Sequence, residues 1–374
     1  MPNIQDHALA VGSQTLGDRP FDALDALILS QLVYLPMEGY VTYGKVSSVA
    51  QAWDFLKANV DPSGFDRFQK KRWKLFETCA ALDRYAGWKM CDYVNEIDVG
   101  REMQFCACTF RLPGGVSVIA FRGTDLTVVG WKEDLNMSYM TVPSQHEAAE
   151  YILRASEKTG DALMLCGHSK GGNLCVYASA TTDASTRERI RRVYAFDAPG
   201  VDEETLHSWG YALVSSRIES YLPQSSVVGM LLNYHPVYTV VEAATIGILQ
   251  HDAMTWQVQD GVFVTLAGVD MTGRLTDEAI HAWLAGMETE ERRFLVDTLY
   301  QVVDAAQAEL VTDLATDWLE SAGKMLEAIR GLDTKTKRSV VRLLHSLFST
   351  GASEIVKLVI SELLKIRKSG GNGE

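Results

Sequence analysis

The stretch ALMLCGHSKGGNLCVYASA, residues 162–180, carries the most informative pattern in the chain. Its first five residues form a short apolar run, as in a strand that a sheet buries on both faces, and the residues from Lys170 onward are typical of a helix. Between them stands Gly167-His168-Ser169-Lys170-Gly171-Gly172, which contains the pattern G-x-S-x-G. The stretch therefore predicts a strand, a sharp turn that carries Ser169, and a helix.

Strand and helix patterns alternate on both sides of this stretch. The strand patterns are a hairpin (103–112 and 116–121) and single strands at 162–166, 192–196, 212–220 and 237–242. Helical patterns cover 20–33, most of 50–90, 144–158, a segment from Lys170, 203–209 and 225–232. Strands that alternate with helices imply βαβ units. We expect an α/β fold over residues 1–272, with a mostly parallel central sheet flanked by helices and an N-terminal helical segment. Only helical periodicity follows from about 276, so residues 273–374 are predicted to form an all-helical C-terminal subdomain or cap.

Composition narrows the class of protein. The chain has 374 residues, 47% of them hydrophobic, and a formal net charge of −13, which argues against nucleic acid as a partner. No basic segment leads into an apolar run near the N-terminus, and no apolar run approaches 18 residues. None of the six cysteines forms a C-x-x-C pair, which favours buried thiols over disulfides or zinc. These features predict a cytoplasmic protein with no metal or organic cofactor.

The G-x-S-x-G pattern has a chemical meaning at a strand–helix junction. A serine on a strained turn there projects its hydroxyl above the sheet, and small neighbours are required because the backbones crowd. The following helix directs its positive end and the N–H of Lys170 towards the serine, where an oxyanion would develop. The alternative is a glycine-rich turn with a capping serine. We predict Ser169 as a nucleophile and Lys170 N–H as an oxyanion donor.

A second oxyanion donor is expected in a loop after an earlier strand. The segment FRGTD, residues 121–125, occupies that place. Gly123 allows the backbone to turn, so the N–H of Thr124, helped by its hydroxyl, would face the tetrahedral intermediate. The alternative is that Arg122 and Asp125 are a surface ion pair and Thr124 a turn residue.

These motifs together resemble those of class 3 lipases. FRGT (121–124), Trp131 and Asp134 in GWKEDLN, and GHSKGG follow one another as in that signature. The whole chain is most similar to an uncharacterised bacterial branch of that superfamily, through DALILSQLVYL, GHSKGGN, FDAPG, VVGMLL and QHD before a tryptophan. The resemblance implies an α/β-hydrolase fold, a Ser169 nucleophile and oxyanion donors at Thr124 and Lys170. Lys170 replaces the leucine usual in class 3 lipases, which predicts a charge near the acyl pocket and argues against a purely apolar substrate.

The general base is predicted from chain order, which in this fold runs serine, acid, histidine. His251 follows the strand 237–242 and lies in a loop before another short strand, which is the expected position. The remaining histidines after Ser169 lie too early, directly before a strand, or in the helical region: His207, His235, His281 and His345.

The acid is less constrained. Class 3 lipases place an aspartate in the loop after strand 212–220, where this chain has Ser225 and Ser226. A second known location is the end of the preceding strand, which here carries Asp197. We predict Asp197 as the acid, with Glu219 next and Asp252 last, because Asp252 is too close in sequence to support its neighbour's ring. The alternative for Asp197 is a turn or capping residue before Pro199.

The predicted function is a serine hydrolase that cleaves carboxylic, lipid-like acyl esters through an acyl-enzyme intermediate. Alternatives are a thioesterase or acyltransferase with the same triad, an amidase or peptidase, and a hydrolase-fold binding protein that has lost catalysis, which Ser225 at the common acid position favours. The apolar helix 225–232 would line an acyl pocket or the core. Segment 339–368 suits a membrane surface or lid, but helix–helix packing explains it better. Acyl chain length and oligomeric state stay open.

Overall fold

The computed structural model describes residues 2–42, 44–124, 128–137, 140–226, 228–230, 235–245 and 247–270, together with 290, 293, 294 and 298. The chain divides into two compact units. One comprises Met1–Gly123 and Thr141–His281, and the other Thr124–Met140 and Ala282–Glu374. Apart from four residues, the predicted C-terminal helical subdomain lies outside the described residues, as do His281, His345 and segment 339–368.

A nine-stranded sheet forms the centre of the first unit, in the order β1-β2-β3-β4-β5-β6-β7-β8-β11. The strands are β1 (Ser47–Ser48), β2 (Lys89–Asp98), β3 (Met103–Leu112), β4 (Val116–Phe121), β5 (Ala162–His168), β6 (Ile190–Phe196), β7 (Ile218–Pro223), β8 (Tyr238–Val241) and β11 (Thr265–Leu266). Strands β4 to β8 run parallel, and the pairs outside them are antiparallel. The α/β fold is therefore as predicted, but the sheet is mixed. Short connections such as the turn between β3 and β4 can join only antiparallel neighbours.

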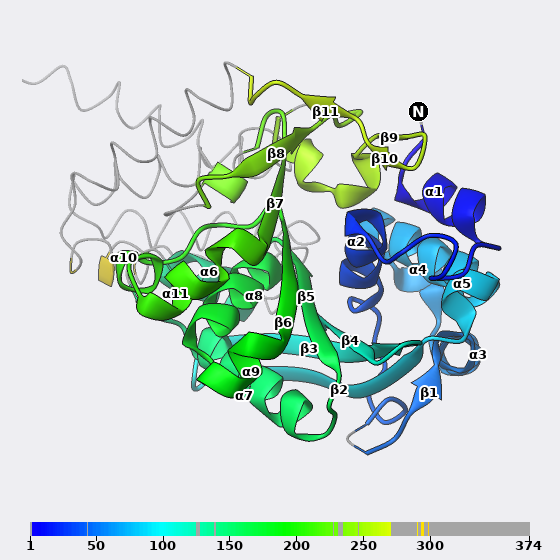
Figure 1. The fold of residues 1–374 in the computed structure, drawn as a ribbon, viewed down its shortest axis with the longest axis horizontal. Helices are drawn as coiled ribbons and strands as arrows, with labels where there is room; N and C mark the ends of the chain where they lie inside the picture. Colours follow the sequence, from blue (N-terminus) through cyan, green and yellow to red (C-terminus); the bar gives the residue numbers. More distant parts are fainter. Residues whose placement is uncertain are drawn as a thin grey trace, which may run out of the picture. The chain divides into compact units, whose positions relative to one another are not determined.

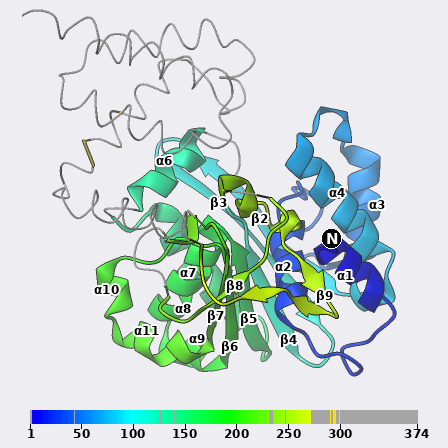
Figure 2. The ribbon, with the colours of Figure 1, turned by 90° about the horizontal axis from the view of Figure 1, so that it is seen from above.

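Helices cover both faces of this sheet, as Figures 1 and 2 show. One layer contains the N-terminal helices α1 (Ile4–Val11), α2 (Ala23–Leu32), α3 (Val49–Asn59), α4 (Arg67–Ala80) and α5 (Asp83–Ala86). The other contains α7 (Pro143–Glu157), α8 (Lys170–Thr181), α9 (Ala184–Arg189), α10 (Glu203–Leu206) and α11 (Trp209–Val214). In β4, Val118 and Ala120 join the core under the N-terminal layer, whereas Ile119 and Phe121 join the core under α7 and α8. Alternate side chains are thus buried on opposite faces, which explains the continuous apolar runs.

One sequence prediction about local structure is wrong. Residues 212–220 form the end of α11, a 3₁₀ turn (Ser215–Arg217) and only the start of β7. The reason is a capping signal: Ser208 accepts a hydrogen bond from Tyr211 N–H and starts a helix ahead of the strand. Within 225–232 the described part contains a 3₁₀ turn, Val228–Met230, in agreement with the predicted turn of helix. Strand β2 begins at Lys89, at the end of the region predicted to be helical.

The segment that follows β8 folds mostly without long elements. It contains the 3₁₀ turns Gly247–His251 and Ala253–Thr255 and a two-stranded ribbon of β9 (Val258–Gln259) and β10 (Val262–Phe263). Its apolar residues Ala253, Met254 and Trp256 join the core under the N-terminal helices. This packing fixes the loop that carries His251.

Three further features concern the cysteines, the search for membrane-spanning helices and the second unit. All six cysteines are buried and free, as predicted. No helix in the described ranges is both long enough and apolar enough to cross a membrane. In the second unit, α6 (Val128–Asn136) is the helix that carries Asp134.

Candidate active site

Ser169 stands on a strained turn between β5 and α8. Its backbone has φ 59° and ψ −133°, a conformation that costs a residue with a side chain about 1–3 kcal/mol. Two hydrogen bonds hold it there: Ser169 N–H donates to Phe196 O at 2.9 Å, and Ser169 O accepts from Gly172 N–H at 2.9 Å. The first bond ties the turn to the end of β6, so the neighbouring strand helps to fix the serine.

The glycines around Ser169 are required by close backbone contacts. A Cβ on Gly167 would collide with the backbone of Gly171, and one on Gly171 would collide with Phe121 O. A Cβ on Gly123, in the loop after β4, would lie 2.6 Å from His168 O and 3.0 Å from Ser169 Cβ. The loop FRG therefore lies directly against the serine, which explains why the G-x-S-x-G and FRGT motifs occur together.

The structure brings Asp197 and His251 together at the carboxyl ends of the strands. His251 Nδ1 lies 2.6 Å from Asp197 Oδ2. Because a carboxylate only accepts, Nδ1 carries the proton and Nε2 presents its lone pair. Asp197 is 1% exposed and also has a positive φ, 42°. Its N–H donates to Tyr221 O at 2.8 Å, which anchors the end of β6 to β7.

The second oxygen of Asp197 has two donors of its own. Ser226 Oγ donates to Oδ1 at 2.5 Å, and Gly229 N–H donates to the same atom at 3.0 Å. Both donors come from the loop after β7, where the common acid position lies. The serine at that position thus supports a carboxylate supplied by the neighbouring strand.

His168 binds the backbone of the loop that carries His251. Its Nε2 lies 2.7 Å from His251 O, so Nε2 donates, and the two imidazole rings are 4.5 Å apart. Burial, and then the nearby charges of His251 and Arg72, lower the pKa of His168 well below its usual value. His168 is therefore a neutral, buried donor. Ser169 and His251 form no hydrogen bond with each other, and such bonds often form only in the complex with substrate.

The other predicted acids lie in different interactions. Glu219 binds Arg192 Nε at 2.9 Å and accepts from Tyr221 Oη at 3.0 Å. Asp252 forms an ion pair with Lys71 at 2.6 Å and caps the turn Ala253–Thr255.

Ser225 donates through its hydroxyl to Asp270 and through its N–H to Gln250 Oε1. Two histidines passed over as bases also have other partners. His235 Nδ1 lies 2.8 Å from Tyr211 Oη, and His207 Nδ1 lies 2.8 Å from Glu203 O.

Lys170 differs from expectation. Its side chain is 1% exposed, and Nζ donates to Gln104 O at 2.7 Å and to Gln104 Oε1 at 2.9 Å. The ammonium group is therefore buried against β3, whereas the sequence suggested a charge near an acyl pocket. Lys170 N–H lies in the first turn of α8, where N–H groups lack intrahelical acceptors.

Thr124 begins the second unit, where its hydroxyl donates to Asp134. Thr124 and Asp134, which both belong to the lipase-like signature, are thus hydrogen-bonded to each other. The side chains of Trp131 and Asp125 lie outside the described residues, so the predicted pair of Arg122 with Asp125 is untested, and Arg122 Nη2 donates to Asn95 Oδ1 at 2.8 Å.

Sequence reasoning overlooked the supporting residues. Nothing in the sequence marked Ser226 and Gly229 as partners of Asp197, because only the parallel pairing of β6 with β7 places their loop beside it. His168 is adjacent to Ser169 in sequence, but its contact with His251 spans 83 residues. The one available signal was the adjacency of strand ends in a parallel sheet.

One cluster of the described residues has the spacing of metal ligands. Atoms of His7, Asp22 and Asp25 lie within 4.8 Å of one another. Arg84 binds Asp25 through two nitrogens, at 3.0 and 2.5 Å, and Arg19 binds Asp22 at 2.5 Å. Two guanidinium groups therefore already balance the carboxylates, and the cluster fits a buried ion-pair network rather than a metal site.

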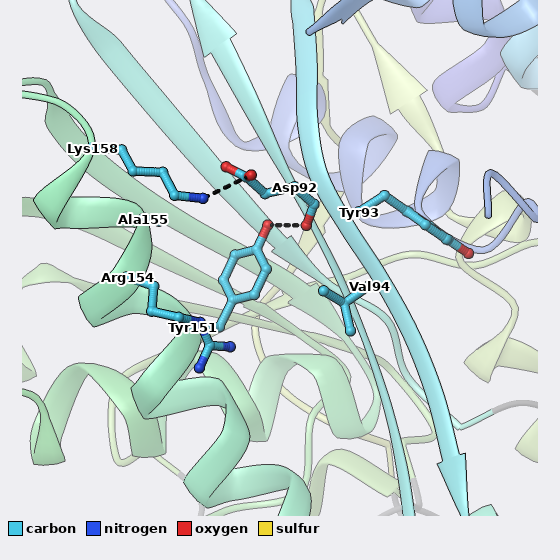
Figure 3. A pocket seen from close by; sticks show the side chains of 7 residues that line it. All are labelled: Asp92, Tyr93, Val94, Tyr151, Arg154, Ala155 and Lys158. Atoms are coloured by element: carbon cyan, nitrogen blue, oxygen red, sulfur yellow. Dashed lines mark hydrogen bonds and ion pairs between the residues drawn. The ribbon is translucent and has the colours of Figure 1, made fainter. Parts of the chain in front are cut away.

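A cavity of about 50 Å³ lies away from Ser169, at a bulge in β2 (Figure 3). Lys158 Nζ donates to Asp92 Oδ1 at 2.8 Å, and Tyr151 Oη donates to Asp92 O at 2.8 Å. These bonds hold Asp92 at φ 56°. The cavity is large enough for a few water molecules, and its polar groups stabilise the bulge.

Comparisons with known proteins place the chain in a family. It matches the Mbeg1-like family over residues 79–301. No curated protein matches it. Among solved structures, it is similar to M37 lipase, with 12% identity, a TM-score of 0.39, and coverage of 72% of this chain and 84% of that one. It is also similar to Rhizomucor miehei lipase in its propeptide complex, with 15% identity, a TM-score of 0.32, and coverage of 55% and 67%. Because the family match covers more than half of the sequence, the chain belongs to the Mbeg1-like family.

Proposed function

We propose that this protein is a serine hydrolase that cleaves carboxylic acyl esters with Ser169 as nucleophile, His251 as general base and Asp197 as the acid that orients it. The observation that carries the proposal is the joint strain of Ser169 and Asp197, at the ends of adjacent parallel strands, with His251 bound to the second of them. Strained residues persist where the surrounding structure holds them, and they gather at active sites.

The proposed mechanism follows from the protonation states. Asp197 accepts from His251 Nδ1, so Nε2 is free to take the proton of Ser169 Oγ as that oxygen attacks the acyl carbon. The carbonyl oxygen then carries the negative charge, and Lys170 N–H at the start of α8 is positioned as a donor. The alcohol leaves with the proton from His251, and water releases the acid by the reverse steps. Thr124 N–H as second donor stays a prediction from chain order.

Lipid-like acyl esters are the proposed substrates on the strength of the class 3 lipase-like motifs. The burial of Lys170 supports this choice, because its ammonium group is bound to Gln104 and is not an exposed charge. The hypothesis of lost catalysis rested on Ser225 at the common acid position. Asp197 supplies a carboxylate from the neighbouring strand instead, and this supports an intact site.

The test is hydrolysis of 4-nitrophenyl butyrate, octanoate and palmitate by purified protein. We expect turnover with one chain length preferred, and loss of at least about a thousandfold in kcat in Ser169→Ala and in His251→Ala, as expected for members of a catalytic unit. Ser216→Ala, in the exposed 3₁₀ turn before β7, is the matched control and should keep full activity. Turnover that survives Ser169→Ala in all three esters would contradict the proposal.

A further inference from the structure

Arg72 has no carboxylate in ion-pair contact among the described residues, and its guanidinium packs on a tyrosine that reaches the loop beside Ser169. Arg72, on α4, places Cζ 3.6 Å from the centre of the Tyr34 ring and donates from Nε to Gln31 Oε1 at 3.1 Å. The Tyr34 hydroxyl lies against Gly123, close enough to collide with a Cβ there, and that same Cβ would lie 3.0 Å from Ser169 Cβ. Three successive contacts, through Tyr34 and Gly123, therefore connect Arg72 to the serine.

Acidic groups that could neutralise Arg72 are bound elsewhere. Among the described residues, no carboxylate oxygen lies within 4.0 Å of its nitrogens. Asp252, which follows His251 in sequence, pairs with Lys71 at 2.6 Å. Lys71 thus docks α4 on that loop, and Asp252 forms its ion pair with Lys71 and not with Arg72.

The guanidinium of Arg122 lies close enough to Arg72 for the two charges to repel each other. Burial lowers the pKa of Arg72, and the charge of Arg122, from the FRGT segment, lowers it further, although Tyr34, Asp252 and Asp66 oppose these effects. The charge of Arg72 also acts on His168, next to Ser169. It contributes, after burial and the charge of His251, to the lowered pKa of His168.

The physical argument is one of desolvation. A partly buried guanidinium with no carboxylate in contact loses hydration, and the bond from Nε to Gln31 Oε1 restores only part of it. The contact with the Tyr34 ring and the bond to Gln31 hold the group in place, and a guanidinium can bind the two oxygens of an oxyacid through two nitrogens at once. A substrate that carries such a group would restore the lost interaction.

We propose that Arg72 is a specificity-determining residue that binds a negatively charged oxyacid group, a carboxylate or a phosphate, on the acyl ester. The proposal rests on the proposed hydrolase function and deepens it by naming the substrate class. The charged group lies on the acyl chain if the substrate is a half-ester of a dicarboxylic acid. It lies on the alcohol if the substrate is a phosphate-bearing glycerol ester.

Two matched ester pairs test the proposal and separate these sources. One pair is 4-methylumbelliferyl hemiglutarate against 4-methylumbelliferyl pentanoate. The other is 1-oleoyl-lysophosphatidic acid against 1-monooleoylglycerol. For each pair the readout is kcat/KM for the anionic ester divided by kcat/KM for the neutral ester. We expect this ratio to favour one anionic ester in wild type and to fall at least about tenfold in Arg72→Gln, the usual effect of losing a hydrogen bond to a charged group.

Two further variants keep the result interpretable. Arg72→Lys retains the charge and should retain a preference between wild type and Arg72→Gln, whereas Lys74→Gln, an exposed residue of the same helix that pairs with Glu77, should keep the wild-type ratio. Circular dichroism confirms the fold of each variant. A wild-type ratio near one for both pairs, or a ratio that Arg72→Gln leaves unchanged, overturns the proposal while Ser169-dependent hydrolysis of the neutral esters continues. Loss of all Ser169-dependent hydrolysis would instead contradict the proposed function, and this inference with it.

Discussion

Replacing Asp197 with asparagine tests the orientation of His251 with the smallest possible change in shape. Ser226 Oγ and Gly229 N–H both donate to Oδ1, so the amide oxygen of an asparagine must occupy that place and the NH₂ group must face His251. Facing a donor, Nδ1 can only accept, so the ring proton moves to Nε2. The ring would then present a proton, and not a lone pair, to Ser169.

The expected magnitude follows from this change of tautomer. A serine triad with its histidine in the wrong tautomer loses about 10⁴ in kcat, as found for chymotrypsin-type enzymes, and this equals about 5.5 kcal/mol of transition-state stabilisation. The contacts on Oδ1 survive, so stability should change little. Steady-state hydrolysis of the preferred 4-nitrophenyl ester measures kcat and KM, and thermal unfolding measures stability.

The matched control is Asp260→Asn. Asp260 is another aspartate with a positive φ, 51°, but it lies in the β9–β10 turn. The same chemical change there should leave kcat within about twofold of wild type, since surface substitutions rarely have larger effects. A folded Asp197→Asn protein that keeps more than about a tenth of the wild-type kcat would refute the assignment of the acid.

Three further predictions follow from individual contacts. In Gly229→Ala, the new Cβ would lie 2.6 Å from Asp197 Oδ1 and 2.9 Å from Ser226 Oγ, so kcat should fall at least about tenfold, whereas Gly87→Ala, in open space, should leave it unchanged; equal activities in the two variants would show that the contacts on Oδ1 do not matter. Burial lowers the pKa of His7, His168 and His235 in the folded chain, so the unfolded chain binds more protons below about pH 6.5. The unfolding temperature should therefore drop from pH 7 to pH 5. His168→Gln should make this pH dependence smaller, and an unaltered slope would argue that His168 is not held neutral. Lys170→Leu removes two hydrogen bonds to Gln104 but keeps the backbone N–H, so stability should fall by about 3 kcal/mol in urea unfolding while kcat stays within a few fold; a collapse of kcat in folded protein would assign the ammonium group a catalytic role.

Much of the fold was predictable because its signals are local. The strand–turn–helix over 162–180 depends on an apolar run, a pair of crowded glycines and a helical composition that lie next to one another in sequence. The errors arose where a short apolar run suits both a strand and a helix, as in residues 212–220, and where a capping serine decided the outcome. The antiparallel half of the sheet depends on β2, whose register is interrupted by the bulge at Asp92.

The proposed site was predictable only in part. Motif and chain order indicated Ser169, Asp197 and His251, and the structure brings the last two into contact. The positions of Ser226, Gly229, His168 and Arg72 depend on contacts between distant segments, which one sequence does not reveal. The Lys170 side chain likewise binds Gln104 on β3, which is distant in sequence, whereas the motif alone suggested a charge near the acyl pocket.

The central claim is that Ser169 is an activated nucleophile, and covalent labelling tests it most directly. Purified protein treated with a fluorophosphonate probe should carry one adduct, which peptide mass spectrometry locates on Ser169. Labelling should vanish in Ser169→Ala and slow at least about a hundredfold in His251→Ala, because the base activates the attacking oxygen. An adduct on another residue, or folded wild-type protein that stays unlabelled while it is stable in the assay, would contradict the account.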